Sequence, residues 1–97
     1  MPHPRHDLDP AFATPVRLSL MAALGADEEI EFGAIRDLLE TSDSAVSKAI
    51  ATLEGAGYVK TRRGSVGRRP RVWVRPTGRG SAAYARHLAA LRAIAGL

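Results

Sequence analysis

Arginines are concentrated in one short stretch of this sequence, between Tyr58 and Arg79, which holds eight lysines and arginines and no acid. A guanidinium group stays charged and presents a planar fork of N–H donors that matches the oxygens of a phosphate. Such a run indicates a surface that meets a polyanion, and nucleic acid is favoured over a membrane because no adjacent amphipathic helix has a basic face. The arginines predicted to make these contacts are Arg62, Arg63, Arg68, Arg69 and Arg71.

The rest of the composition narrows the class of protein. Residues 27–54 hold eight acids against two bases, while the whole chain of 97 residues has a formal net charge of +4. Because the chain has no cysteine, disulfides, thiolate zinc sites and cysteine nucleophiles are excluded. No apolar run approaches the ~18 residues of a membrane span, and there is no Ser-His-Asp spacing or glycine-rich phosphate loop. We expect one small cytoplasmic domain that is not an enzyme, with no cofactor, metal or membrane partner.

The arginine-rich stretch has the pattern of a β-hairpin. The runs YVKTRR and RVWVR alternate in residue type, and residues 64–70 between them are rich in turn formers. Since Val72 and Val74 should face the core, Trp73 is expected on the opposite face, where it packs on the hairpin or on an arginine stem.

A helix is predicted directly before the hairpin, over residues 42–56. Ser42 is a good N-cap, Asp43 suits the positive end of the helix dipole, and Gly57 is the expected left-handed residue after the helix. The apolar stripe that should face the core consists of Val46, Ile50 and Leu53.

Three further helices and an N-terminal arm complete the pattern. The first helix begins at Thr14 and Pro15 and stops at Gly25, and the last begins at Thr77. Between the first helix and the helix at 42–56, a short strand near Ile30 leads to a helix whose buried face is predicted as Ile35, Leu38 and Leu39. Residues 1–12 are expected to be flexible and residues 13–97 to form the domain, and two histidines on such an arm seldom make a specific metal site.

The segment SDSAVSKAIATLEGAGYVKTRRGSVGRRPRVWVRPTGRG combines a Ser cap, a Leu-Glu-x-Ala-Gly-Tyr-Val helix end, a Gly-Arg-Arg-Pro turn and a Thr-x-x-Gly helix start. In this combination the sequence resembles the winged helix-turn-helix transcription factors of the MarR and ArsR type, in particular their short stand-alone members, from about Val16 to Leu91. The resemblance implies a mainly α fold with a small β-hairpin, an α+β class with the order α-β-α-α-β-β-α.

The resemblance further implies a sequence-specific regulator that binds double-stranded DNA. Its recognition helix, residues 42–56, would enter the major groove, and its wing, residues 58–76, would lie on the backbone or in the minor groove. Arg68 and Arg69, at the turn, are the best placed to enter a narrow minor groove. The candidate contacts from the helix are Ser42, Ser44, Ala45, Ser47, Lys48 and Thr52.

The last predicted helix carries more apolar surface than a terminal segment can leave in water. It can return onto the first helix or pair with a second copy. The resemblance favours a homodimer that sets two recognition helices about one DNA turn, roughly 34 Å, apart. The predicted interface residues are Tyr84, Leu88, Leu91 and Ile94. His87 is expected at the surface or in this interface, and an effector would have to bind in the dimer cleft or be absent.

Two other functions stay open at this point. A winged helix can bind a protein partner through its basic hairpin, and a chromosomal protein can bind DNA without regard to sequence. The slope of affinity against salt, competition by duplex DNA, and comparison of an operator with random duplex distinguish the three.

Overall fold

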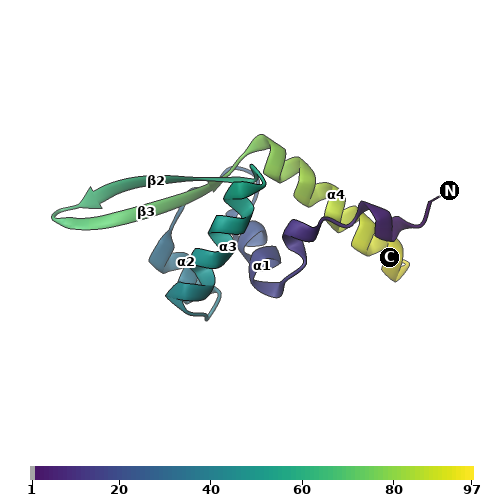
Figure 1. Cartoon of the computed structure of the whole chain (residues 1–97), viewed down its shortest axis with the longest axis horizontal. Helices are drawn as coiled ribbons and strands as arrows, with labels where there is room; N and C mark the ends of the chain where they lie inside the picture. Colours follow the sequence, from purple (N-terminus) through teal and green to yellow (C-terminus); the bar gives the residue numbers. More distant parts are fainter. Residues whose placement is uncertain (1) are drawn as a thin grey trace.

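The computed structural model describes residues 2–97, over which the chain forms four α-helices, two short 3-10 turns and one three-stranded sheet. The molecule is 56 Å long, with a hairpin projecting from one end and both ends of the described chain near the other (Figure 1). The elements are η1 (Pro4–Asp7), η2 (Pro10–Phe12), α1 (Pro15–Leu24), β1 (Ile30–Glu31), α2 (Phe32–Leu38), α3 (Asp43–Gly55), β2 (Val59–Val66), β3 (Arg69–Pro76) and α4 (Gly78–Ala95). This order confirms the predicted α+β class and winged helix-turn-helix topology.

The helices begin where the sequence predicted, because a side chain satisfies a free N–H group at each start. Thr14 accepts from the backbone N–H of Arg17 in α1, and Ser42 accepts from that of Ala45 in α3. Thr77 does the same for Gly80 in α4, at 2.9 Å. These caps confirm the predicted N-termini of the three helices.

The turn from α2 to α3 differs from the prediction at one apolar residue. Ile35 is fully buried and Leu39 packs against the core, but Leu38 is 61% exposed. The helix α2 ends at Leu38, and Leu39 serves as its C-cap. Leu38 therefore lies on the solvent side of the last turn, and its predicted burial was wrong.

The sheet has the order β1-β3-β2, and all its pairs are antiparallel. We predicted a long turn over residues 64–70, but the strands continue to Val66 and Arg69, so the turn contains only Gly67 and Arg68. Gly67 has a φ of +63°, which permits this tight connection. Gly64 pairs with Arg71 within the sheet, and the Trp73 ring lies so close to it that a Cβ there would be 3.0 Å from the ring.

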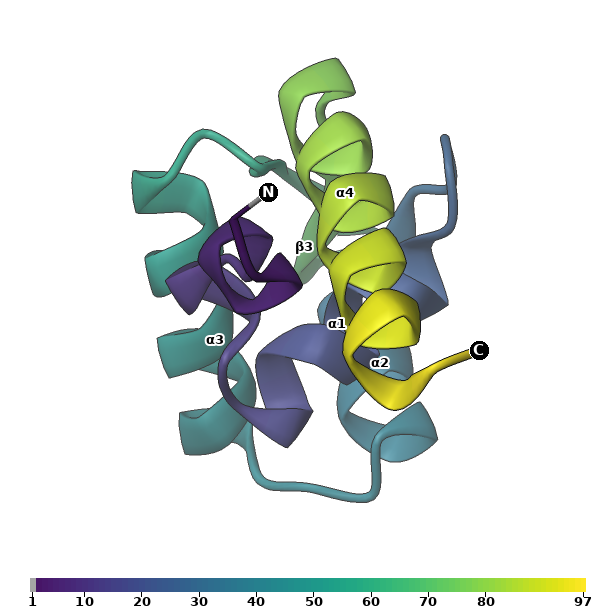
Figure 2. The ribbon, with the colours of Figure 1, turned by 90° about the vertical axis from the view of Figure 1, so that its right-hand side faces the viewer.

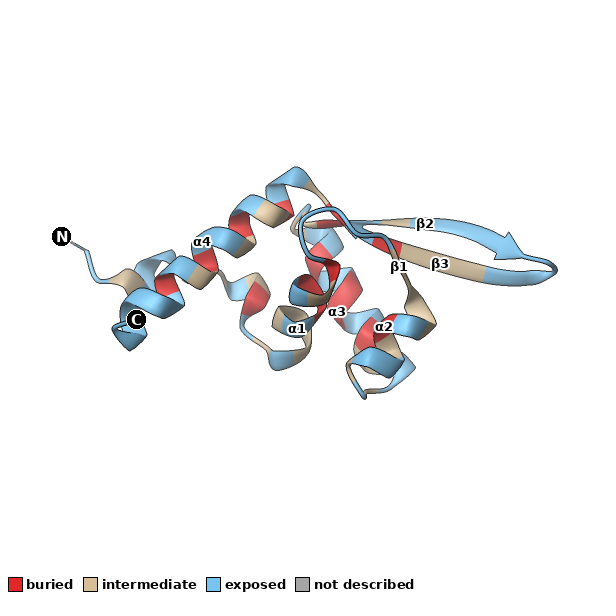
Figure 3. Cartoon of the chain, turned by 180° about the vertical axis from the view of Figure 1, so that it is seen from behind, coloured by how far each residue is buried: buried red, intermediate tan, exposed pale blue. Residues whose placement is uncertain are grey.

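The hydrophobic core lies where α1, α2, α3 and the root of the hairpin meet. Its largest fully buried side chains are Leu20, Met21, Leu24, Ile35, Val46, Leu53, Val59 and Val74. Buried residues gather in the helices and at the hairpin root, whereas most of the distal half of the hairpin is exposed (Figure 3). The hairpin is therefore anchored at one end only.

Residues 2–12 pack on the domain, whereas we expected a flexible arm; Met1 lies outside the described residues. The turn η1 contacts α4, and the N-terminal turns lie beside this helix when the molecule is viewed from its end (Figure 2). Asp9 accepts a hydrogen bond from the Tyr58 hydroxyl, and Phe12 stacks on Tyr58 with ring centroids 5.3 Å apart. These partners lie far along the chain, so local sequence pattern does not reveal them.

The face of α4 that packs on its own chain is made of small residues and a histidine. The buried positions are Gly80, Ala83, His87 and Ala90. His87 is only 5% exposed, and its Nδ1 accepts the backbone N–H of Asp9 at 3.0 Å. We expected His87 at the surface or in the dimer interface, but within its own chain it is buried, because the N-terminal segment covers it. Within residues 2–97 neither α4 nor another helix is long and apolar enough to cross a membrane.

Replacing Gly80 by alanine should lower the free energy of unfolding by about 3 kcal/mol, because the new Cβ would lie 2.0 Å from the Tyr58 carbonyl oxygen. Gly78 is the matched control in the same helical turn, since nothing lies within 4 Å of its added Cβ. Gly78→Ala should stabilise the fold by up to about 1 kcal/mol. Urea denaturation measures the free energy of unfolding of both variants. Equal changes in the two variants would contradict the close approach of α4 to Tyr58.

The hydrogen bond to Asp9 raises the pKa of Tyr58 above its ordinary value. The tyrosinate cannot donate, so the stabilisation is present below the ordinary tyrosine pKa of about 10 and is lost as the pH rises through the folded-state value. Absorbance titration of the two tyrosines should show one ionising late. Tyr58→Phe should remove the late ionisation, and Asp9→Ala should lower the pKa of Tyr58. Superimposable curves for the wild type and Asp9→Ala would rule out this contact.

Candidate nucleic-acid interface

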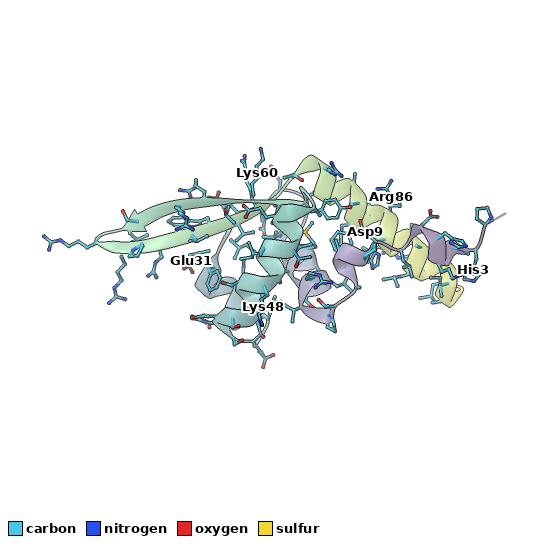
Figure 4. All side chains as sticks on the ribbon, in the orientation of Figure 1. His3, Asp9, Glu31, Lys48, Lys60 and Arg86 are labelled. Carbon is cyan, nitrogen blue, oxygen red and sulfur yellow. The ribbon has the colours of Figure 1, made fainter. Side chains whose placement is uncertain are left out.

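The exposed face of α3 is narrow and mildly polar. Its apolar stripe turns inward, and Ala49 joins that stripe in the core. Lys48 lies on α3 below the hairpin (Figure 4). Of the residues predicted to contact DNA, Ser44, Ser47, Lys48 and Thr52 are exposed and Ala45 is half-buried. Ser42 is also exposed, but its hydroxyl oxygen already accepts the N–H of Ala45 at 3.1 Å. Such a face is slim enough for a major groove about 12 Å wide.

One face of the hairpin borders α3, and we call it the inner face. Thr61, Arg63 and Val72 line a groove of about 220 Å³ together with Ser47 and Ala51 of α3. The Thr61 hydroxyl donates to a carboxylate oxygen of Glu54, at 2.9 Å, and so ties β2 to the end of α3. The structure thus brings the predicted helix contact Ser47 and the predicted wing contact Arg63 to one groove.

The turn at the distal end of the hairpin carries two of the predicted arginines. Arg68 lies in the turn and Arg69 begins β3, and both are exposed. Over the described residues 2–97, neither these two nor Arg63 forms an ion pair. Their guanidinium groups are therefore available to a polyanion.

The opposite face of the hairpin, which we call the outer face, carries the other two predicted arginines. Arg62 forms two hydrogen bonds to Glu29, at 2.7 and 3.3 Å, and its Cζ lies 4.3 Å from the centre of the Trp73 ring. Arg71 lies 4.0 Å from a carboxylate oxygen of Glu31. Lys60 belongs to the same face and points away from α3 in Figure 4. The structure therefore separates Arg62 and Arg71 from the groove beside α3.

Hydrogen bonds between charged side chains shift the pKa of three groups, Glu29, Arg62 and Arg36. The hydrogen bond from Arg62 holds the pKa of the Glu29 carboxyl below its ordinary value and in turn raises the pKa of Arg62. Arg36 of α2 donates hydrogen bonds to its neighbour Asp37 and to Asp43, the first residue of α3. These bonds raise the pKa of Arg36. Glu29, Arg62 and Arg36 therefore stay ionised at neutral pH.

Sequence reasoning missed the acidic partners of these arginines. Glu29 and Arg62 are 33 residues apart, and no periodic pattern connects them. The separation of charge along the chain was the available signal, because a strongly acidic segment and a strongly basic one attract each other if the fold permits. Arg36 was missed for the same reason, since its partner Asp43 lies across the turn between two helices.

A second candidate surface lies at the end of the molecule opposite the hairpin. The N-terminal segment, α1 and α4 enclose an apolar groove of about 750 Å³, whose walls include Leu8, Leu18 and Leu91. Among the predicted interface residues, Tyr84 and Leu88 are half-buried, while Leu91 is 37% and Ile94 44% exposed. The distal half of α4 thus leaves apolar surface uncovered by its own chain.

Comparison with known families and structures agrees with this architecture. Residues 16–95 match the family described as winged helix DNA-binding domain. A transcriptional regulator homologue from Pyrococcus horikoshii OT3 is 30% identical, with a TM-score of 0.80 over 89% of this chain and 85% of that one. NolR from Sinorhizobium fredii is 29% identical, with a TM-score of 0.68 over 89% of this chain and 78% of that one. No curated protein gave a significant match.

A more distant structure shares the fold. AbsC, a MarR family transcriptional regulator from Streptomyces coelicolor, is 20% identical, with a TM-score of 0.69 over 92% of this chain and 64% of its own. The family match spans every element from α1 to α4, including the helix and hairpin that border the groove. The chain therefore belongs to the winged helix DNA-binding domain family, whose fold and regulator relative are those of a DNA-binding transcriptional regulator and not of an enzyme.

Proposed function

We propose that this protein is a cytoplasmic regulator that binds specific sequences of double-stranded DNA as a homodimer. In this proposal α3 enters the major groove, and the hairpin follows the backbone or the next minor groove. The observation that carries it is the shared groove between α3 and the inner face of the hairpin, in which Ser47 and Arg63 face the same space. One duplex can contact both elements without a change in the fold.

The two elements would read the duplex in different ways. Side chains near the start of a groove-bound helix reach base edges, so Ser44, Ser47 and Lys48 are proposed to contact bases or nearby phosphates, and Ala45 a thymine methyl group. Arg63 and Arg68 are proposed to contact the phosphate backbone, and the exposed turn can enter a narrow minor groove. Affinity then comes mostly from the hairpin and sequence preference mostly from α3.

The uncovered apolar surface of α4 supports the homodimer. Leu91 and Ile94 lie at the same end of the molecule as the apolar groove beside α1, so a two-fold pairing would bury both surfaces at once. A dimer would also present two copies of α3 to one duplex. Any effector would bind in the cleft that this pairing creates.

Selection from random duplex DNA should recover an imperfect palindrome with half-sites about one helical turn apart, bound at least ~10³-fold more tightly than random duplex. Lys48→Ala should change the preferred sequence.

Arg68→Ala with Arg69→Ala should weaken binding to all sequences and lower the slope of log affinity against log salt by about 0.9 for each phosphate that the variant no longer binds.

The control for that double variant is Arg86→Ala with Arg92→Ala, which removes the same charge from exposed positions on α4. The control variant should keep the slope of the wild type. Equal slopes for the two double variants would show that the hairpin turn does not bind phosphates. Displacement by an acidic protein but not by duplex DNA would instead favour a protein partner.

Replacing Leu91 and Ile94 by aspartate should give monomers, because two charges would have to be buried in the proposed interface. Sedimentation velocity measures the mass, and the affinity for the selected palindrome should fall by about 10²-fold or more because a monomer binds only one half-site. Leu38→Asp is the control, since Leu38 is also an exposed apolar residue, 61% against 37% for Leu91 and 44% for Ile94, but lies on α2. A dimer that survives the α4 substitutions would place the interface elsewhere.

A further inference from the structure

The hairpin presents two chemically different faces, although arginines occur on both. Side chains of adjacent residues in a strand point to opposite faces. Arg63 faces the groove beside α3, whereas its neighbour Arg62 lies on the outer face with Trp73 and Glu29. The two residues thus offer the same group to opposite sides of the hairpin.

Two arginines of the outer face, Arg62 and Arg71, are paired with acids from the segment before α2. Glu29 accepts both hydrogen bonds from the guanidinium fork of Arg62, and Glu31 lies close to Arg71. A phosphate approaching this face would meet two carboxylates, and Arg62 could reach it only by leaving both Glu29 and the Trp73 ring. An unpaired Glu29 would then repel the duplex. The part of the outer face around Arg62 and Trp73 is therefore less favourable for DNA than the inner face, although Lys60 and Arg75 lie nearer the hairpin root on the same side.

The same contacts fix the hairpin to the rest of the domain. Beyond Thr61 and Val72, the hairpin extends away from the helices, and residues 62–70 are all exposed. On the inner face, the Thr61–Glu54 hydrogen bond ties β2 to α3. On the outer face, Glu29 connects Arg62 to the loop that precedes β1. Restraint on both faces sets the direction in which the distal half projects.

We infer that Glu29, Arg62 and Trp73 form a positioning cluster that holds the hairpin against the domain and does not touch DNA, while the duplex lies on the inner face and the turn. This inference rests on the proposed DNA-binding function and makes it more specific. It moves Arg62, and with it Arg71, from the predicted DNA contacts to residues that act through the position of the hairpin. Arg63 and Arg68 remain as the phosphate contacts.

The adjacent arginines provide a matched pair of variants, because Arg62→Ala and Arg63→Ala remove the same charge from neighbouring positions. With the selected palindrome, or a mixed-sequence duplex of roughly two helical turns, Arg63→Ala should weaken binding about tenfold. It should also lower the salt slope by about 0.9 per protomer. Arg62→Ala should leave the salt slope at the wild-type value. A slope lowered equally by both variants would overturn the inference.

Glu29→Gln tests the positioning role by the sign of its effect. The substitution removes an acid, so charge alone predicts tighter binding to DNA. A positioning role predicts weaker binding, since Arg62 loses its anchor and the hairpin must be ordered when it binds. Thermal unfolding checks that the variant is folded. Tighter binding by folded Glu29→Gln would overturn the positioning role.

Trp73 is the single tryptophan of the chain, so its fluorescence reports on the outer face alone. Acrylamide should quench it equally in the free protein and in the complex with duplex DNA, because the duplex lies on the other face. Protection of Trp73 by DNA would overturn the inference. A wild-type protein that fails to bind any duplex would contradict the proposed function itself, so the two failures are distinguishable.

Discussion

The arrangement of this protein depends on the buried root of its hairpin. Val59 and Val74 are almost fully buried where β2 and β3 leave the core, and Gly57 turns the chain from α3 into β2 with a φ of +80°. The first turn of α4 lies so close to the Tyr58 carbonyl that Gly80 has no room for a side chain. The hairpin projects well beyond this root, so a small shift there would move the distal arginines by a large distance. The angle between α3 and the hairpin is thus set by packing, and it determines whether both can meet one duplex.

Charge is sorted in the fold as well as along the sequence. The net charge of +4 is modest for a DNA-binding protein, but the acids before α2 pair with arginines of the outer face. Arg63 at the inner face and Arg68 and Arg69 at the turn stay unpaired and can attract phosphates. The acidic segment therefore lowers the positive charge around Arg62 and Arg71 without cancelling that of the whole hairpin. Composition alone does not show this distinction.

The features that sequence predicted correctly are those that short-range chemistry determines. The caps at Thr14, Ser42 and Thr77, the left-handed Gly57 and the inward stripe of α3 each depend on residues a few positions apart. The features that the sequence did not reveal have the opposite origin. His87 is buried because Asp9 and Phe12 cover it, and the N-terminal segment packs on the domain through distant partners that include Tyr58. Sequence pattern also does not distinguish Arg62 and Arg71 from Arg63, whereas the strand register and the distant acids do.

In the proposed complex, α3 and the inner face of the hairpin meet the same duplex side by side. This arrangement can be tested by titrating isotopically labelled protein with duplex DNA and following the backbone amide resonances. We expect the resonances of Ser44, Ser47 and Lys48 to shift together with those of Arg63 and Arg68, at the same DNA concentrations, while those of the first two turns of α4 stay in place. Shifts confined to one of the two elements, or centred on α1 and α4, would contradict the account.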